Sequence, residues 1–346
     1  MKSIKKYLSW FVFVVFMLSG NILLVKTGTG IAGTDVIKWR YQAHYSPASA
    51  SYSKSIVPFV EKIKERTNGR LIIELYPSRA LVPNKEILNA VRRGMVEMGD
   101  GAPSYFRDKV PLAGVISLPM AFQNPAECAY YLKHLGVEQM LRDQFAKLGV
   151  YYSSEKIYHT QLATKKPIRK IDDFNGLKLR SFGIVQKFLT DLGASALYLP
   201  GSEVYTALSS GVVDGAHWGA AQGNYSMKFY DVCKYHLKLN LILAPTNAWL
   251  VNQNALNKLP KDIKDILICE MEKAFWYGTN WYGFGEEQTL AKIQKELGVE
   301  VTTLPPMDVR KAREVAMKIW NKEAKKSPEC AKAIKILKDF LKSLGR

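Results

Sequence analysis

The chain is poor in the patterns that most metal, redox and catalytic sites need. It has four cysteines in 346 residues and no CxxC pair, so metal-binding and redox motifs are unsupported. The five histidines never stand at i, i+4 spacing, and no nucleophile elbow, phosphate-binding P-loop or HExxH motif occurs. An enzyme is not excluded, but these motifs define no catalytic constellation.

The cysteines are scattered as well as few. Cys128, Cys233, Cys269 and Cys330 lie far apart in the sequence, and in an oxidising compartment four cysteines permit three disulfide pairings. Cys269 stands in the helical run IKDILICEMEKAF, where a buried free thiol is the simplest expectation. The sequence leaves the pairing open.

The N-terminal apolar stretch lacks the continuity of a membrane span, because Ser19, Gly20 and Asn21 interrupt it. Three lysines precede this stretch, and Gly30-Ile31-Ala32 offers the small residues of a cleavage site. This pattern predicts a signal peptide over residues 1–33, cleaved near Ala32. No cysteine lies near the cleavage point, so a lipid anchor is not indicated. We therefore expect an exported, periplasmic protein.

Acidic residues are scarce relative to basic ones. Asp and Glu number 31 against 49 Lys and Arg, and removing the four lysines of the leader lowers the formal charge from +18 to +14. Such a balance suits nucleic acid, an anionic membrane surface or an anionic small molecule. No nucleic-acid module signature appears and the basic residues are dispersed, so we expect no nucleic-acid partner.

Strand-like and helix-like segments alternate after the leader, which predicts α/β architecture with parallel strands under crossover helices. The stretch LAGVISLP, residues 112–119, is expected to be a short strand. The pattern restarts near residue 158, and a helical run from Pro260 to about Leu297 would span roughly 55 Å and lean on both units. We predict a two-lobed fold with these boundaries: lobe I, 34–157 plus 245–283; lobe II, 158–244 plus 284–346.

Arg180 ends a predicted strand in the segment NGLKLRSFG. Alternation would place it beside Lys178 as a solvated cation, whereas a guanidinium at the mouth of a cleft would clamp a carboxylate. Ligands of open α/β sheets bind outside the carboxyl ends of the strands. Pro200-Gly201 and His217-Trp218 end the next two predicted strands, so all three ends share one edge if the strands are parallel. This convergence favours the clamp.

Three segments together resemble the substrate-binding proteins of tripartite ATP-independent periplasmic (TRAP) transporters, the DctP-type family. They are LYPSRALVPNKEILNAVRRGMVEMGDG, GLKLRSFG and LYLPGSEVYTALSSGVVDGAHW. The likeness runs from about Val36 to Lys342, and the PGSE and DGAHW pieces are most similar to the branch that binds 2-oxo acids and lactate. The resemblance implies two lobes with a long helix across both, as in periplasmic binding proteins. It also implies that the lobes close on an organic anion and pass it to a membrane permease, without chemistry.

The resemblance also assigns roles to residues. Arg180 matches the family's carboxylate-binding arginine, and Trp218 matches a tryptophan of the same motif. His217 stands where the branch has a glutamate that helps to bind a metal cation. Because sodium and calcium prefer oxygen ligands, we expect no cofactor, and we expect His217 to donate a hydrogen bond to the ligand instead.

Further candidate ligand contacts follow the ends of the predicted strands or match aromatic positions of the family. They are His44, Tyr45, Tyr105, Phe122, His159, Gln161, Asn247 and Trp249.

We thus expect a solute-binding protein, monomeric or dimeric, that captures a small organic carboxylate for a TRAP-type permease. The expected ligands are monocarboxylates, 2-oxo acids and hydroxy acids, aromatic ones included. Two alternatives stay open at this point: an extracytoplasmic ligand-binding module for signalling, and a secreted α/β enzyme.

Overall fold

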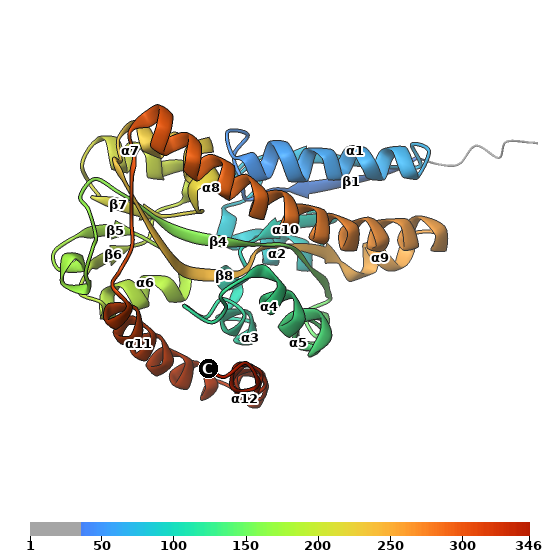
Figure 1. Cartoon of the computed structure of the whole chain (residues 1–346). Helices are drawn as coiled ribbons and strands as arrows, with labels where there is room; N and C mark the ends of the chain where they lie inside the picture. The colour runs from blue at the N-terminus through green and yellow to red at the C-terminus, as the bar shows by residue number, and fades with distance from the viewer. Residues whose placement is uncertain (1–35) are drawn as a thin grey trace, which may run out of the picture. The chain divides into compact units, whose positions relative to one another are not determined.

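The computed structural model describes residues 36–346 (Figure 1). The predicted signal peptide and its cleavage site lie outside the described residues. Among residues 36–346, no helix has both the length and the apolar character that a bilayer crossing requires.

One mixed sheet forms the centre of the molecule. Its strands, in chain order, are β1 (Ile37–Gln42), β2 (Leu71–Tyr76), β3 (Met98–Gly101), β4 (Val150–Thr164), β5 (Lys178–Arg180), β6 (Ser195–Leu197), β7 (Gly215–His217), β8 (Tyr235–Asn252) and β9 (Glu300–Thr302). They are ordered β2-β1-β3-β8-β4-β7-β5-β6 in space, and β9 pairs with β8. The α/β class and the two-lobed arrangement predicted from the sequence are confirmed.

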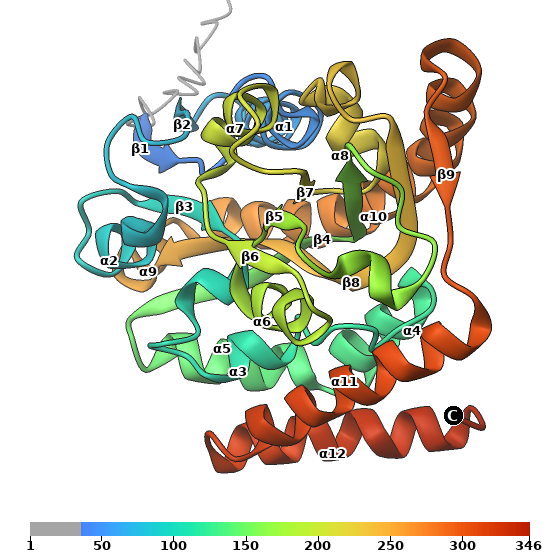
Figure 2. The same ribbon diagram turned by 90° about the vertical axis from the view of Figure 1, so that its left-hand side faces the viewer.

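Helices cover both faces of this sheet. In chain order they are α1 (Val57–Arg66), α2 (Ile87–Arg92), α3 (Leu112–Val115), α4 (Pro125–Ala129), α5 (Val137–Ala146), α6 (Gly183–Asp191), α7 (Val204–Ser209), α8 (Ala221–Ser226), α9 (Gln253–Lys258), α10 (Lys261–Leu297), α11 (Pro306–Ala324) and α12 (Pro328–Ser343). Helices α4 and α5 pack under β4, whereas α10 crosses it on the opposite face (Figure 1). Helices α11 and α12 lie side by side at the base of the molecule, against α3 and α6 (Figure 2).

Two long strands, β4 and β8, connect the lobes. They pair antiparallel from Val150↔Asn252 to Thr164↔Tyr235, with irregularities near Lys156 and between Thr160 and Leu162. The expectation of parallel strands is therefore only partly correct: β8 is antiparallel to β3 and β4, and β4 is antiparallel to β7. The reason is that the chain crosses between the lobes in both directions within one sheet. The predicted lobe boundaries at 157/158 and 244/245 fall inside these strands, the one at 283/284 falls inside α10, and all three stay predictions.

Two other local predictions are wrong. Residues 112–115 form the buried helix α3 rather than a strand, because this apolar stretch packs into the core and pairs with no strand. Cys269 is exposed, whereas the other three cysteines are buried. It lies on the outer face of α10, and all four cysteines are free thiols.

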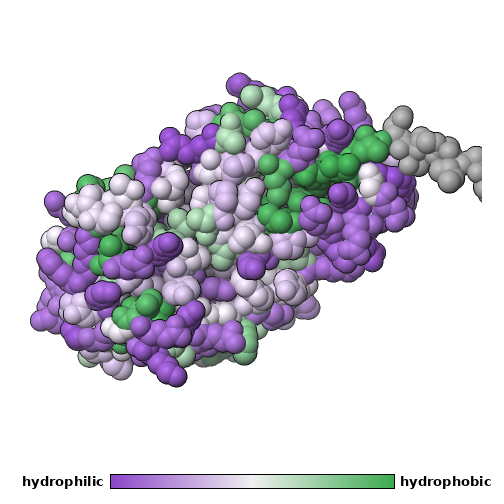
Figure 3. Space-filling view, turned by 90° about the horizontal axis from the view of Figure 1, so that it is seen from above, coloured by the Kyte–Doolittle hydropathy of each residue, from purple (hydrophilic) through white to green (hydrophobic). Residues whose placement is uncertain are grey.

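Hydrophilic side chains predominate on the face seen from above, and apolar side chains gather in a few areas between them (Figure 3). Helix α10, which is confirmed as one continuous helix of 37 residues, runs across this side of the molecule (Figure 1). Two buried residues attach it to β4. Thr279 Oγ1 accepts a hydrogen bond from the Ile157 amide at 3.0 Å, and Gly278 lies against the Lys156 side chain.

Helix α10 also binds the start of α8 through Glu286. This carboxylate is 4% exposed and accepts hydrogen bonds from the Gln222 amide at 3.2 and 3.1 Å. Burial raises the pKa of Glu286 to about 8, and the backbone hydrogen bonds only partly oppose that shift. Glu286 thus ties α10 to the lobe that carries β5, β6 and β7.

Because α10 approaches β4 closely, alanine substitutions at two glycines of this helix should change the free energy of unfolding in opposite directions. An added Cβ at Gly278 would lie 3.2 Å from the Lys156 Cβ, whereas nothing lies within 4 Å at Gly283. Gly283→Ala should raise the free energy of unfolding by about 0.5–1 kcal/mol through helix propensity. Gly278→Ala should lower it, because two packed elements must separate. Denaturant unfolding measures both, and equal stabilisation by the two substitutions would contradict the contact.

The raised pKa of Glu286 predicts a pH-dependent stability. The folded chain holds a proton that the unfolded chain releases between pH 4.5 and about 8, so this group makes the free energy of unfolding fall as pH rises through that window. Glu286→Gln removes this contribution. Its stability relative to the parent should therefore increase with pH by up to about 1.4 kcal/mol per unit, then level off above pH 8. The exposed neighbour Glu287→Gln is the matched control and should show no such trend.

Candidate functional site

The candidate site is built around Arg180 at the end of β5. Strand β5 is parallel to both β6 and β7, so the three strand ends meet at one edge as predicted. Lys178 on the same strand is exposed, but Arg180 is completely buried. Alternation gives the two side chains the same face. The burial of Arg180 therefore comes from the residues that cover the end of the strand.

Arg180 is held by backbone carbonyls rather than by an acid. Its Nε donates to Leu199 O at 3.0 Å and its Nη1 to His217 O at 2.5 Å. Nη2 is buried without a hydrogen-bond partner among residues 36–346. Burial lowers the pKa of the Arg180 guanidinium, and the nearby Tyr105 and Tyr198 phenols oppose that shift. A buried charged donor without a partner is costly, and this geometry is what an anionic ligand would complete.

Aromatic side chains enclose a small cavity beside this guanidinium. Arg180 Cζ lies 5.1 Å from the centre of the Phe182 ring and 5.2 Å from that of Trp218, within cation–π range. The cavity is lined by His44, Tyr45, Ala102, Tyr105, Tyr158, Phe182 and Trp218. Its volume is about 10 Å³, roughly what one water molecule needs. The lobes must therefore separate before a ligand of several heavy atoms can enter.

Asp100 in β3 holds His44, which lines the cavity. Asp100 Oδ1 accepts from the His44 amide at 2.6 Å and lies 3.3 Å from His44 Nδ1. Asn247 Nδ2 donates to Asp100 Oδ2 at 2.7 Å. His44 thus lines the cavity, whereas Asn247 stands behind it and orients Asp100.

His217 supports the site from beneath. Its ring stacks on Phe182 at 4.8 Å and 9°. Its Nδ1 lies 2.9 Å from Ser181 Oγ and its Nε2 lies 2.8 Å from Thr160 Oγ1. Burial, and secondly the Arg180 charge, hold the pKa of His217 well below its ordinary value. His217 is therefore neutral, and both ring nitrogens already have protein partners.

Four predicted contacts lie away from Arg180. His159 and Gln161 line a separate polar cavity, where His159 Nδ1 is 2.8 Å from Asn240 Oδ1. Phe122 packs on Tyr131 in the core. Trp249 is buried and stacks on Phe59 at 4.5 Å.

Tyr158, Phe182 and Ala102 line the cavity but were not among the predicted contacts. The alternation of side chains along a strand could have predicted that Tyr158 lines the cavity. Tyr158 and Thr160 lie on one face of β4, toward the cavity and His217. His159 and Gln161, which alternate with them along the strand, point to the other side. Phe182 stands two residues after Arg180, within the same segment NGLKLRSFG.

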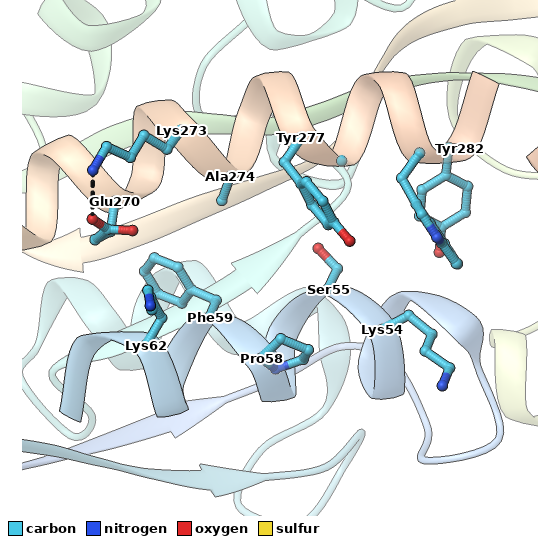
Figure 4. Close-up of a pocket in the computed structure, with 12 residues that line it drawn as sticks. Lys54, Ser55, Pro58, Phe59, Lys62, Glu270, Lys273, Ala274, Tyr277 and Tyr282 are labelled. Atoms are coloured by element: carbon cyan, nitrogen blue, oxygen red, sulfur yellow. Dashed lines mark hydrogen bonds and ion pairs between the residues drawn. The ribbon is translucent and has the colours of Figure 1, made fainter. Parts of the chain in front are cut away.

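A larger groove between α1 and α10 is a weaker candidate (Figure 4). Its volume is about 490 Å³, but its lysines Lys54, Lys62 and Lys273 are all exposed. Figure 4 shows Lys273 paired with Glu270, at 2.9 Å. Solvated or paired charges attract a ligand weakly. The Arg180 guanidinium, in contrast, is buried, and its Nη2 has no hydrogen-bond partner within the described residues. We therefore place the site at Arg180.

Proteins of known function and known structure resemble this chain in sequence and in fold. A periplasmic protein from Nostoc sp., named as binding monocarboxylate 2-oxoacids, is 25% identical over 323 residues, covering 90% of this chain and 86% of the relative. A TRAP periplasmic solute-binding protein from Pseudoalteromonas atlantica, solved with sodium and pyruvate, superposes with a TM-score of 0.79 at 23% identity, covering 90% of this chain and 95% of that chain. A TRAP solute-binding protein from Bordetella bronchiseptica, solved as a dimer with calcium and picolinate, has a TM-score of 0.82 at 20% identity, with 90% and 93% covered.

These structures correct one expectation. From His217 we expected no cofactor, but the two solved proteins hold sodium or calcium together with a carboxylate ligand. A metal ion beside the ligand is thus compatible with this fold.

The family model of bacterial extracellular solute-binding proteins, family 7 (DctP), matches residues 42–327. This match spans most of the chain, which therefore belongs to family 7 of the bacterial extracellular solute-binding proteins.

Proposed function

We propose that this protein captures a small organic carboxylate through Arg180 and delivers it to the membrane permease of a TRAP transporter. The observation that carries the proposal is a buried guanidinium whose Nη2 has no hydrogen-bond partner within residues 36–346. This guanidinium lies against Phe182 and Trp218, two of the rings that line the cavity. Within residues 36–346 the terminal nitrogens Nη1 and Nη2 make one backbone hydrogen bond, to His217 O, and the Tyr105 phenol lies close to the guanidinium. A carboxylate that accepts from both terminal nitrogens would have the geometry that guanidinium groups favour.

Closure of the lobes would complete the site. Arg79 donates to Glu203 across the predicted lobe boundary at 2.7 Å, and Lys85 lies 4.3 Å from the ring centre of Tyr198. All of these side chains are exposed or half-buried. Such contacts are weak individually, so they permit reopening, while the ligand adds the buried interaction that stabilises the closed state.

The residues around Arg180 do not by themselves form a set of metal ligands. Hard cations such as sodium and calcium need several oxygen ligands, and no group of three or more His, Cys, Asp or Glu in the described part of the chain could hold an ion. Both ring nitrogens of His217 are engaged.

The ligand class is supported by the relatives. Their names give 2-oxoacids, pyruvate and picolinate as bound molecules, and each of these carries a carboxylate. We propose that the chain is exported after cleavage near Ala32, works as a monomer or dimer, and releases its ligand chemically unchanged. Candidate contacts are Arg180 and the cavity residues His44, Tyr45, Tyr105 and Trp218, with His217 and Asn247 holding them in place.

Replacing Arg180 tests the clamp. Arg180→Ala should weaken binding of pyruvate, or of the best ligand from a carboxylate panel, by about 10- to 150-fold, because a charge-assisted hydrogen bond is worth about 1.5–3 kcal/mol. Arg180→Lys should recover only part of this loss, since it keeps the charge without the planar fork. Titration calorimetry measures both.

The exposed Arg40→Ala, which removes only a surface pair with Glu97, is the matched control and should bind like the parent. Unchanged affinity in folded Arg180→Ala would reject the clamp. Ligand recovered chemically altered after incubation with the parent protein would instead favour an enzyme.

The Trp218 wall depends on a glycine. A Cβ added at Gly201 would overlap the six-membered ring of Trp218, and the indole would have to leave its place over Arg180. We expect Gly201→Ala to reduce ligand affinity by about tenfold, or ~1.4 kcal/mol, with tryptophan fluorescence shifted in the ligand-free protein. Gly283→Ala, where space is open, should change neither. Parent-like affinity in Gly201→Ala would show that Trp218 does not shape the site.

A further inference from the structure

We infer that the outer side of the helical hairpin α11–α12 binds an anionic membrane surface. The basis is the distribution of charge along the chain. Residues 306–346 hold twelve lysines and arginines against five acids, a formal side-chain charge of +7, which is half of the +14 of the chain without its leader. The inference is independent of carboxylate binding at Arg180, and such a contact would hold the protein at the membrane.

Helix α12 carries its lysines on one side. Lys332, Lys335, Lys338 and Lys342 are all exposed, and at about 100° per residue they fall within an arc of about 120°. The opposite side of the helix is buried in the core. Asp339 lies within the lysine arc and pairs with Lys335 at 2.6 Å. The other three lysines have no acidic partner among residues 36–346.

Helix α11 extends this basic side. Lys338 Nζ donates to Asn321 Oδ1 of α11 at 2.8 Å, so the exposed sides of the two helices adjoin where they lie side by side (Figure 2). Lys318, Lys322 and Lys325 are exposed and follow one another a turn apart, within an arc of about 60°. None of these three has an acidic partner in the part of the chain that the structure describes.

The acids of the hairpin do not neutralise this side. Asp308, Glu323 and Asp339 each pair with one lysine, and Glu329 accepts a hydrogen bond from α5. Glu314 is exposed and has no partner among the described residues. It stands against the six lysines that we call the lysine face: Lys318, Lys322, Lys325, Lys332, Lys338 and Lys342.

The residue types of the lysine face favour a lipid surface over a protein partner. Protein–protein interfaces are depleted of lysine and enriched in tyrosine, tryptophan and arginine. The large aromatic side chains of the hairpin, Trp320 and Phe340, pack on the core instead of standing on its outer side. A lysine ammonium is a strongly hydrated point charge on a flexible stem, which suits mobile phosphate groups. Clusters of about four to eight basic residues on an amphipathic helix are typical of binding to anionic lipids.

Vesicle co-sedimentation tests the inference on the chain without its leader. Vesicles made of equimolar phosphatidylcholine and phosphatidylglycerol carry negative charge, whereas vesicles of phosphatidylcholine alone do not. The protein should sediment with the anionic vesicles at low ionic strength and dissociate as salt is added, because screening weakens the attraction. Equal binding to both kinds of vesicle, or no binding to the anionic ones at low ionic strength, would overturn the inference.

A triple variant locates the contact on the hairpin. Lys322→Gln, Lys332→Gln and Lys342→Gln together remove half of the lysine face and should weaken binding to the anionic vesicles by about tenfold or more. The three side chains are exposed, and glutamine and lysine have similar helix propensities, so the thermal melting temperature should match that of the parent. Parent-like binding by this variant would show that the hairpin is not the contact.

The matched control removes the same number of charges elsewhere. Lys38, Lys64 and Lys258 are exposed on β1, α1 and α9 and have no acidic partner among the described residues. Their combined replacement by glutamine should weaken vesicle binding by less than about threefold. A loss as large as that of the hairpin variant would mean that net charge alone drives binding. A parent protein that binds soluble poly-L-glutamate but not anionic vesicles would assign the lysine face to an acidic protein instead. Either result would overturn the inference.

Discussion

A charged guanidinium buried between two lobes without a complete set of partners is the constraint on which this structure depends. Arg180 lies at the end of β5 where no solvent reaches it. Two backbone carbonyls accept its hydrogen bonds, the Tyr105 phenol lies nearby, and Nη2 has no partner within residues 36–346. A cation in such surroundings is tolerated when its partners are in place and is expensive when they are not. An anionic ligand bound at Arg180 would therefore stabilise the closed form and couple binding to closure.

The surroundings of Arg180 direct this charge rather than cancel it. The Phe182 and Trp218 rings lie over the guanidinium, and their π faces favour a cation without neutralising it. Neutral His217, fixed by two hydroxyl groups, supports Phe182 and offers its carbonyl to Arg180. Acids are kept at a distance or paired with other groups. No acidic side chain among the described residues therefore neutralises the Arg180 charge, which could attract an anionic ligand.

The site and the connection between the lobes share residues. Strand β4 carries Tyr158 on the cavity wall and Lys156 behind it, and it continues through both lobes beside β8. Helix α10 packs on this same segment through Gly278 and Thr279, and reaches α8 through Glu286. A change in the angle between the lobes would therefore move the wall of the cavity directly, without a separate relay.

The sequence alone determined the α/β class, the long helix and the position of Arg180 at a shared edge, because strand periodicity, helix signals and parallel strand ends are local properties of the chain. It also brought His44, Tyr45, Tyr105 and Trp218 forward, and these meet at the cavity. Tertiary structure decided what locality could not. It made residues 112–115 a buried helix, placed His159 and Gln161 on the far face of β4, and packed Phe122 and Trp249 into the core. It also set Glu155 against Lys156 at the centre of the molecule, since burial and charge pairing depend on which distant segments fold against one another.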